Sequence, residues 1–296
     1  MNLYDRKSEN IRRTWILFSA FLIVVIGLGW VFSQVYGNPV ILWFAVAFST
    51  IMSILSYWHS DKIVLGMAKA KPVDMKTNPE LYRIVENLAI TAGLPMPRVY
   101  VVPEKQLNAF ATGRDPKHGV VAVTEGLLEK LDRTELEGVL AHELSHIGNR
   151  DMLVGTVAVI LVGFISLLAD IFLRSLIWGG RDSDRGGSAI FFIIAIALSI
   201  LAPISATLIQ LAISRKRESL ADSSGSLLTR YPEGLAKALE KIAADITPMR
   251  TARNTTAHLW IDDPFTGQNK TAWWHRLFMT HPPIEERIKA LRDLRI

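Results

Sequence analysis

Two histidines and a glutamate stand close together in one short run of the sequence, His142-Glu143-Leu144-Ser145-His146. On a helix, positions i and i+4 share one face, so both imidazoles can reach the same metal ion. Zinc binds neutral imidazole and keeps an open position for water in catalytic sites. It lowers the pKa of that water to about 7, and the carboxylate of Glu143 can take the proton. The run therefore predicts zinc-dependent peptide hydrolysis, with His142 and His146 as ligands and Glu143 as general base.

A third ligand is expected downstream, in the run Glu218-Ser219-Leu220-Ala221-Asp222. Glu218 would complete a site of two histidines and one glutamate. Asp222, one helical turn later, could accept the free ring N–H of His142 and fix its tautomer. The alternative for Glu218 is an ion pair with a neighbouring basic residue on a helix surface. The alternative for the first run is a surface helix with two solvated histidines.

Both runs must lie on helices for this chemistry. The segment from Thr134 to Asn149 contains no proline. Thr134 is followed three residues later by Glu137, which is typical of a capping box and predicts a helix start there. An apolar stripe at helical spacing supports the helix, made of Leu136, Val139, Leu140, Leu144 and Ile147.

Four segments are apolar over roughly 20 residues or more, long enough to cross a bilayer as helices. Tryptophans near their ends suit the membrane interface. The second segment follows the first at once, so the first is not expected to be a cleaved signal peptide. The four segments are Trp15 to Val35, Pro39 to Trp58, Met152 to Trp178 and Ser188 to Ile213.

Basic residues set the expected orientation. Four precede the first segment and four lysines follow the second, whereas the link at 36–38 carries no charge. Cytoplasmic loops carry the excess of Lys and Arg, so the protease part is expected in the cytoplasm. The formal net charge of +5 fits contact with an anionic leaflet. No basic stripe with interleaved aromatic residues indicates nucleic-acid binding.

The expected organisation has four parts: a transmembrane hairpin at 1–60, a first cytoplasmic protease part at 61–151, a second transmembrane hairpin at 152–213, and a second protease part at 214–296. The fold class is mainly α with a small β-sheet and about four transmembrane helices. The third apolar segment begins six residues after His146, or about 9 Å along a helix. Zinc is therefore expected close to the cytoplasmic membrane surface.

Between the second and third apolar segments, three short runs predict strands, at 97–102, 107–112 and 119–124. An exposed edge strand can hold an extended peptide by backbone pairing. Asn108 and Ala109 are candidates for that substrate contact, and the alternative is that their strand lies in the core. The stretch 245–274 has weak periodicity and predicts a lid or an irregular loop. His281 could donate to a developing oxyanion, or be a structural histidine.

The chain contains no cysteine, which excludes disulfides and thiolate ligands and is compatible with a reducing cytoplasm. No phosphate-binding glycine loop is present, so ATP-driven unfolding of substrates is not encoded in this chain.

Over nearly its full length the chain resembles the HtpX-type membrane zinc metalloproteases, which are related to the CAAX prenyl proteases. The resemblance rests on the paired N-terminal apolar segments, on the runs at 107–113, 142–151 and 218–222, and on Thr280-His281-Pro282-Pro283 with Glu286-Arg287. It implies a gluzincin-like fold, with one zinc ion per chain held by His142, His146 and Glu218. It also implies a multi-pass protein of the bacterial inner membrane that cleaves misfolded or unassembled membrane proteins during stress.

Two other classes of function are weighed against the protease. One is a non-catalytic, zinc-containing membrane scaffold or chaperone, which would have no need of Glu143 as a base. The other is a transporter or channel, and the apolar segments carry too few ionisable residues to favour it. The substrates, the cleavage preference and formation of a homo-oligomer are left open.

Overall fold

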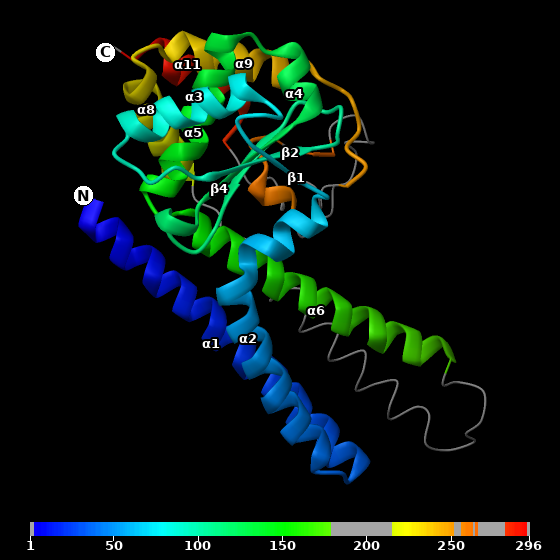
Figure 1. Cartoon of the computed structure of the whole chain (residues 1–296). Helices are drawn as coiled ribbons and strands as arrows, with labels where there is room; N and C mark the ends of the chain where they lie inside the picture. The colour runs from blue at the N-terminus through cyan, green and yellow to red at the C-terminus, as the bar shows by residue number, and fades with distance from the viewer. Residues whose placement is uncertain (1–2, 179–214, 252–255, 263, 266–281, 295–296) are drawn as a thin grey trace.

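The computed structural model describes residues 3–178, 215–251, 256–262, 264–265 and 282–294. Two long helices, α1 (Leu3–Tyr36) and α2 (Val40–Met67), form a hairpin that extends away from the rest of the protein (Figure 1). Both are long and apolar enough to cross a membrane. Several of their large side chains are exposed, with Trp15 at 67% and Trp43 at 70%. Such apolar surface is expected to face lipid.

The third expected apolar segment is helix α6 (Met152–Trp178), which leaves the sheet and its surrounding helices beside the hairpin (Figure 1). It follows α5 (Arg133–Gly148) at a bend of 85°. Leu17 and Phe21 of α1 share an apolar cluster with Val157 and Leu161 of α6. The fourth expected segment, 188–213, lies outside the described residues.

Helix α2 does not end at Trp58, where the apolar segment ends, but continues to Met67 with non-helical backbone angles at His59. Its last turns bury Val64 and Leu65 under the sheet. This helix therefore belongs to both the apolar hairpin and the core around the sheet, and apolar length alone cannot reveal that second role. Its Asp61 also pairs with Arg98 at the start of a strand.

The sheet has four strands, β1 (Lys71–Val73), β2 (Arg98–Val102), β3 (Ala109–Thr112) and β4 (Val120–Thr124), in the order β1-β2-β4-β3. Strands β2 and β4 are parallel, and the other two pairs are antiparallel. The three expected strands are present. Strand β1 was not predicted, because its three residues Lys71-Pro72-Val73 show no apolar alternation.

Helices and loops cover both faces of the sheet. On one face, α3 (Pro79–Thr91) and α5 pack on Val99, Val121 and Val123. On the other face, the end of α2, the start of α6 and Trp260 pack on Phe110 and its neighbours. All residues of β3 and β4 are consequently buried. The other helices among the described residues are α4 (Glu125–Lys130), α8 (Arg215–Thr229), α9 (Pro232–Ala244) and α11 (Ile284–Arg292), with short 3-10 turns at 116–118 and 257–259. The fold is mainly helical with a small mixed sheet, as expected.

Candidate metal centre

Helix α5 carries the first histidine run, and its N-terminus differs from the prediction. Asp132 is the capping residue: its carboxylate accepts from the backbone N–H of Glu135, and Glu135 accepts from the N–H of Asp132 at 2.8 Å. Thr134 instead donates its hydroxyl to Asp132 at 2.7 Å. The predicted capping box of Thr134 and Glu137 is therefore wrong. Two capping patterns overlap in this sequence, and the folded backbone uses the earlier one.

Helix α8 supplies the second carboxylate run and packs closely on α5. Glu218, Asp222 and Gly225 are spaced four and three residues apart, so they share one face of α8. A Cβ atom at Gly225 would lie only 2.9 Å from the backbone nitrogen of His142. Glycine at this position therefore lets the two helices approach closely and brings Glu218 up to the histidines.

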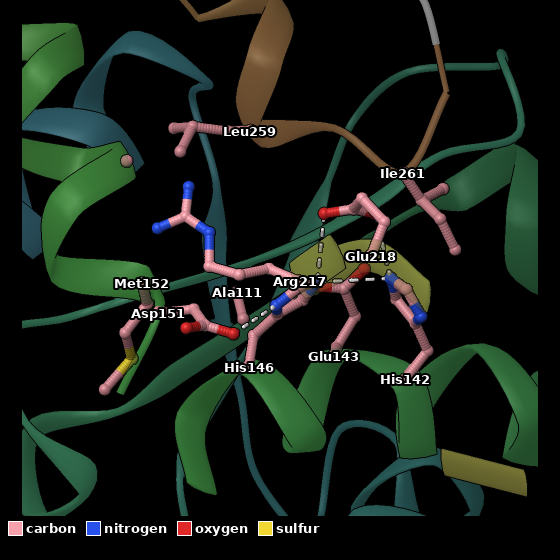
Figure 2. A pocket seen from close by; sticks show the side chains of 11 residues that line it. Ala111, His142, Glu143, His146, Asp151, Met152, Arg217, Glu218, Leu259 and Ile261 are labelled. Carbon is pink, nitrogen blue, oxygen red and sulfur yellow. Dashed lines mark hydrogen bonds and ion pairs between the residues drawn. The ribbon is translucent and has the colours of Figure 1, made fainter. Parts of the chain in front are cut away.

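His142, His146 and Glu218 converge, each offering one ligand atom within 4.8 Å of the others (Figure 2). The two Nε2 atoms lie 3.2 Å apart, and each lies 3.7 Å from a carboxylate oxygen of Glu218. Three ligands about 2.1 Å from a tetrahedral zinc ion would be about 3.4 Å from one another. Two ring nitrogens and a carboxylate facing one point are thus a donor set that fits zinc. Glu218 is 8% exposed, so it is not a surface ion-pair residue.

The surroundings of His146 are strongly negative. Burial lowers the pKa of this imidazole, but Asp151 as a hydrogen-bond partner and the charges of Glu218 and Glu143 outweigh burial and raise it to about 9. Negative charge that favours a proton on a ring nitrogen favours a metal cation for the same electrostatic reason. The fields of these carboxylates therefore support cation binding at this point.

Asp222 lies beside the other histidine. Its Oδ1 is 2.9 Å from Nδ1 of His142, within ion-pair distance. Arg287 of α11 donates to both carboxylate oxygens of Asp222, at 2.8 and 2.9 Å, and to the carbonyl of Ile261 at 3.2 Å. Burial raises the pKa of Asp222, but the charge of Arg287 and the contact with His142 lower it far below its ordinary range. Asp222 therefore stays ionised and can hold the imidazole of His142 in one orientation.

The roles of two supporting residues, Arg287 and Asp151, were not predicted from the sequence. Arg287 and Asp151 both fall within the runs that carry the family resemblance, but no spacing rule connects them to the histidines. Asp151 Oδ2 lies 3.5 Å from Nδ1 of His146. The only sequence feature pointing to Asp151 is its position in the turn directly after the histidine helix.

A cavity of about 60 Å³ opens at the three ligands. By this measure one water needs about 10–15 Å³, so the cavity admits an ion with a few waters. Glu143 is 2% exposed and lines the cavity together with residues of the edge strand, of α6 and of the segment before the last helix. These further lining residues are Ala111, Met152, Gly155, Leu259 and Ile261.

The predicted substrate residues have other partners in this structure. The side chain of Asn108 is fully buried and exchanges hydrogen bonds with the backbone of Asp262. The carbonyl of Ala109 accepts from the N–H of Ile261 at 3.0 Å. Outward-facing backbone groups alternate along a strand, so those of Ala111 face the cavity side. His281 lies outside the described residues.

The family match and the named relatives agree with one another. Residues 75–295 match the description of peptidase family M48. The chain is 46% identical to a protein named "Protease HtpX homolog" from Caldanaerobacter subterraneus subsp. tengcongensis, over 99% of this chain and 98% of that one. It is 48% identical to a protein of the same name from Thermococcus kodakarensis, over 95% of each. Among solved structures it is similar to S. mikatae Ste24p, with a TM-score of 0.49, 20% identity and coverage of 94% of this chain and 66% of that one.

Proposed function

Because the chain belongs to peptidase family M48, we propose that His142, His146 and Glu218 hold one zinc ion and that Glu143 is the general base of an endopeptidase. The chain is a membrane metalloprotease with two apolar helices long enough to cross a bilayer among its described residues. The observation that carries the proposal is the convergence of three ligand atoms within 4.8 Å beside a buried glutamate.

The proposed mechanism assigns separate tasks to the residues of the cavity. Zinc, when bound, supplies Lewis acidity that polarises the scissile carbonyl and makes water acidic enough to attack near neutral pH. Glu143 takes the proton of the attacking water and delivers it to the leaving amine. Asp222 keeps the ring of His142 in place.

The backbone of β3 is the proposed binding edge for the substrate. A peptide added antiparallel to this edge would pair with the outward N–H and C=O of Ala111, next to the ligands. This places the main contact two residues beyond Ala109, because Ile261 already bonds to Ala109. Pairing through backbone atoms makes little demand on side chains, which suits varied polypeptide substrates.

We place the site on the cytoplasmic side of the inner membrane, with membrane proteins that are misfolded or unassembled as substrates. Met152 and Gly155 line the cavity and are also the first residues of the apolar helix α6. A chain segment leaving the bilayer beside α6 would therefore meet the site directly. The protease parts at 61–151 and 214–296 would share this side, with the hairpins 1–60 and 152–213 in lipid.

The absence of cysteine from the chain allows a direct test of this orientation. Asn38 precedes helix α2 in the sequence and Lys76 follows it, and both residues are exposed. In intact cells, a membrane-impermeant thiol reagent should label Asn38→Cys and should spare Lys76→Cys until the membrane is opened. The reverse pattern would place the protease outside the cytoplasm.

The catalytic assignment is tested with purified full-length protein and an unfolded membrane-protein substrate. Glu143→Gln should retain zinc and lose cleavage by at least about 100-fold, since general-base catalysis contributes roughly that much or more. His142→Ala and Glu218→Ala should lose both zinc and cleavage. Glu137→Gln, a partly exposed glutamate on the same helix, is the matched control and should retain both. Normal cleavage by Glu143→Gln would overturn the assignment, and zinc binding without any cleavage by the parent would favour the scaffold.

A further inference from the structure

Asn10, near the start of the first apolar helix, lies at the metal centre and not on a lipid-facing surface. It is 6% exposed, and its Nδ2 donates to Oδ1 of Asp151 at 2.7 Å. The same nitrogen lies 3.5 Å from the carbonyl of Asn149. Its Oδ1 lies 3.5 Å from Nη1 of Arg217. One amide on α1 therefore contacts both the turn after α5 and the residue that precedes Glu218.

Asp151 connects Asn10 to His146, one of the proposed ligands. Its Oδ2 faces Nδ1 of His146 at 3.5 Å, and its backbone N–H donates to the carbonyl of His146 at 3.0 Å. Arg150, with φ +57°, adopts the left-handed conformation that folds the turn back onto α5. A carboxylate beside the outer nitrogen of a ligating imidazole orients its ring. Asn10 holds one oxygen of Asp151 and leaves the other toward His146 (compare the positions of Asp151 and His146 in Figure 2).

The packing of the helices fixes the distance between Asn10 and Asp151. Leu17 and Phe21, two and three turns after Asn10 on α1, share an apolar cluster with Val157 of α6. Helix α6 begins directly after Asp151. A buried amide is costly unless its hydrogen bonds are made, so the contact with Asp151 favours one docked position of α1.

We propose that Asn10 is a positioning residue for the metal centre. Through Asp151 it orients His146, so the affinity of the site for its metal depends on the docking of the first apolar helix. This inference rests on the proposed function, in which His142, His146 and Glu218 hold the ion. Asn10 touches neither the ion nor the reacting atoms.

The test measures the zinc dissociation constant of full-length protein in detergent by competition with a chromophoric chelator. All variants carry Glu143→Gln, which prevents self-cleavage during purification. Asn10→Leu removes the amide at nearly constant volume and should weaken zinc binding by about 3- to 10-fold, less than the loss typical of a direct partner of a ligand. Asn10→Ala replaces it if leucine prevents folding. Thr14→Val is the matched control, because Thr14 is similarly buried on α1 and its hydroxyl donates to the carbonyl of Asn10, its one side-chain hydrogen bond within the described part of the chain.

The decisive measurement is a double-mutant cycle with Asp151→Ala. In that background Asn10→Leu should have no further effect on zinc affinity, since its route to His146 is gone. The inference is overturned if Asn10→Leu acts no more strongly than Thr14→Val, or if its effect persists fully without Asp151. His142→Ala, measured in parallel, distinguishes a failure of the proposed ligand set from a failure of the positioning role of Asn10. If it leaves zinc affinity unchanged, the proposed ligand set has failed, whereas abolished binding with a silent Asn10→Leu rejects the positioning role alone.

Discussion

The two histidines of the metal centre are supported in different ways. On the His142 side, Asp222 accepts two hydrogen bonds from Arg287, and these three residues all lie in the protease part. On the His146 side, Asp151 is held by the neutral amide of Asn10, which belongs to the membrane hairpin. Asp222 lies 2.9 Å from its histidine and Asp151 lies 3.5 Å from the other.

This difference separates a rigid half of the centre from an adjustable half. A buried carboxylate paired with a buried guanidinium has little freedom, because breaking the pair leaves an uncompensated charge. A carboxylate held by an amide can release its partner at lower cost, since a neutral hydrogen bond contributes only about 1 kcal/mol. The half of the site that contacts helix α1 is therefore the half that helix movement can affect.

The largest effect is expected from Arg287→Met, which leaves Asp222 buried without its cation. We expect the free energy of unfolding to fall by about 3–5 kcal/mol, measured by chemical denaturation in detergent. Adding Asp222→Asn should restore part of the loss, because the uncompensated charge is removed. Arg292→Met, which breaks only exposed ion pairs on the same helix, should have a much smaller effect. If the two substitutions lowered the free energy of unfolding equally, the ion pair of Arg287 with Asp222 would not make the His142 side rigid.

The next effect compares the two carboxylates directly. Asp222→Asn should weaken zinc binding by about 10- to 100-fold, as is typical for a direct partner of a ligating histidine. Asp151→Asn should weaken it by less, about tenfold or below, because its contact with His146 is longer. Chelator competition on both variants provides the measurement. A larger loss for Asp151→Asn would reverse the assignment of rigid and adjustable halves.

The smallest effect concerns Asp245, a buried carboxylate outside the metal centre. Like Asp151, which accepts from the amide of Asn10, it accepts hydrogen bonds from neutral donors, and Nζ of Lys130 lies 3.8 Å from its Oδ1. Burial raises its pKa, but the Thr247 hydroxyl and the N–H of Leu107 lower the pKa below its ordinary value. A lowered pKa stabilises the fold above the unfolded pKa of about 3.9, and this stabilisation is lost as the pH falls through the folded value. Asp245→Asn should therefore cost about 1–2 kcal/mol at pH 7.

The pH dependence of that cost is the check. Unfolding of the parent and of Asp245→Asn should be compared from pH 7 down to about 3, and the difference in stability should shrink below about pH 4. A difference that stays constant over this range would show that the carboxylate does not contribute through its charge.

Much of the site could be predicted because it depends on the spacing of residues within single helices. His142 and His146 share a helix face wherever that helix lies, and Glu218 and Asp222 do so on theirs. The apolar helices α1 and α2 follow from composition over a single stretch of chain. The two prediction errors also have local causes. Overlapping capping patterns led to the wrong predicted start of α5, and β1 is too short to show a period.

The sequence by itself determined the proposed ligands, the proposed general base and the apolar helices, since each depends on residues within one or two helical turns or one apolar run. Only the tertiary structure decided which groups hold the histidines in place. Arg287 lies 65 residues from Asp222, and Asn10 lies 141 residues from Asp151. Contacts over such separations depend on how whole helices pack, and no periodicity in the chain records that packing.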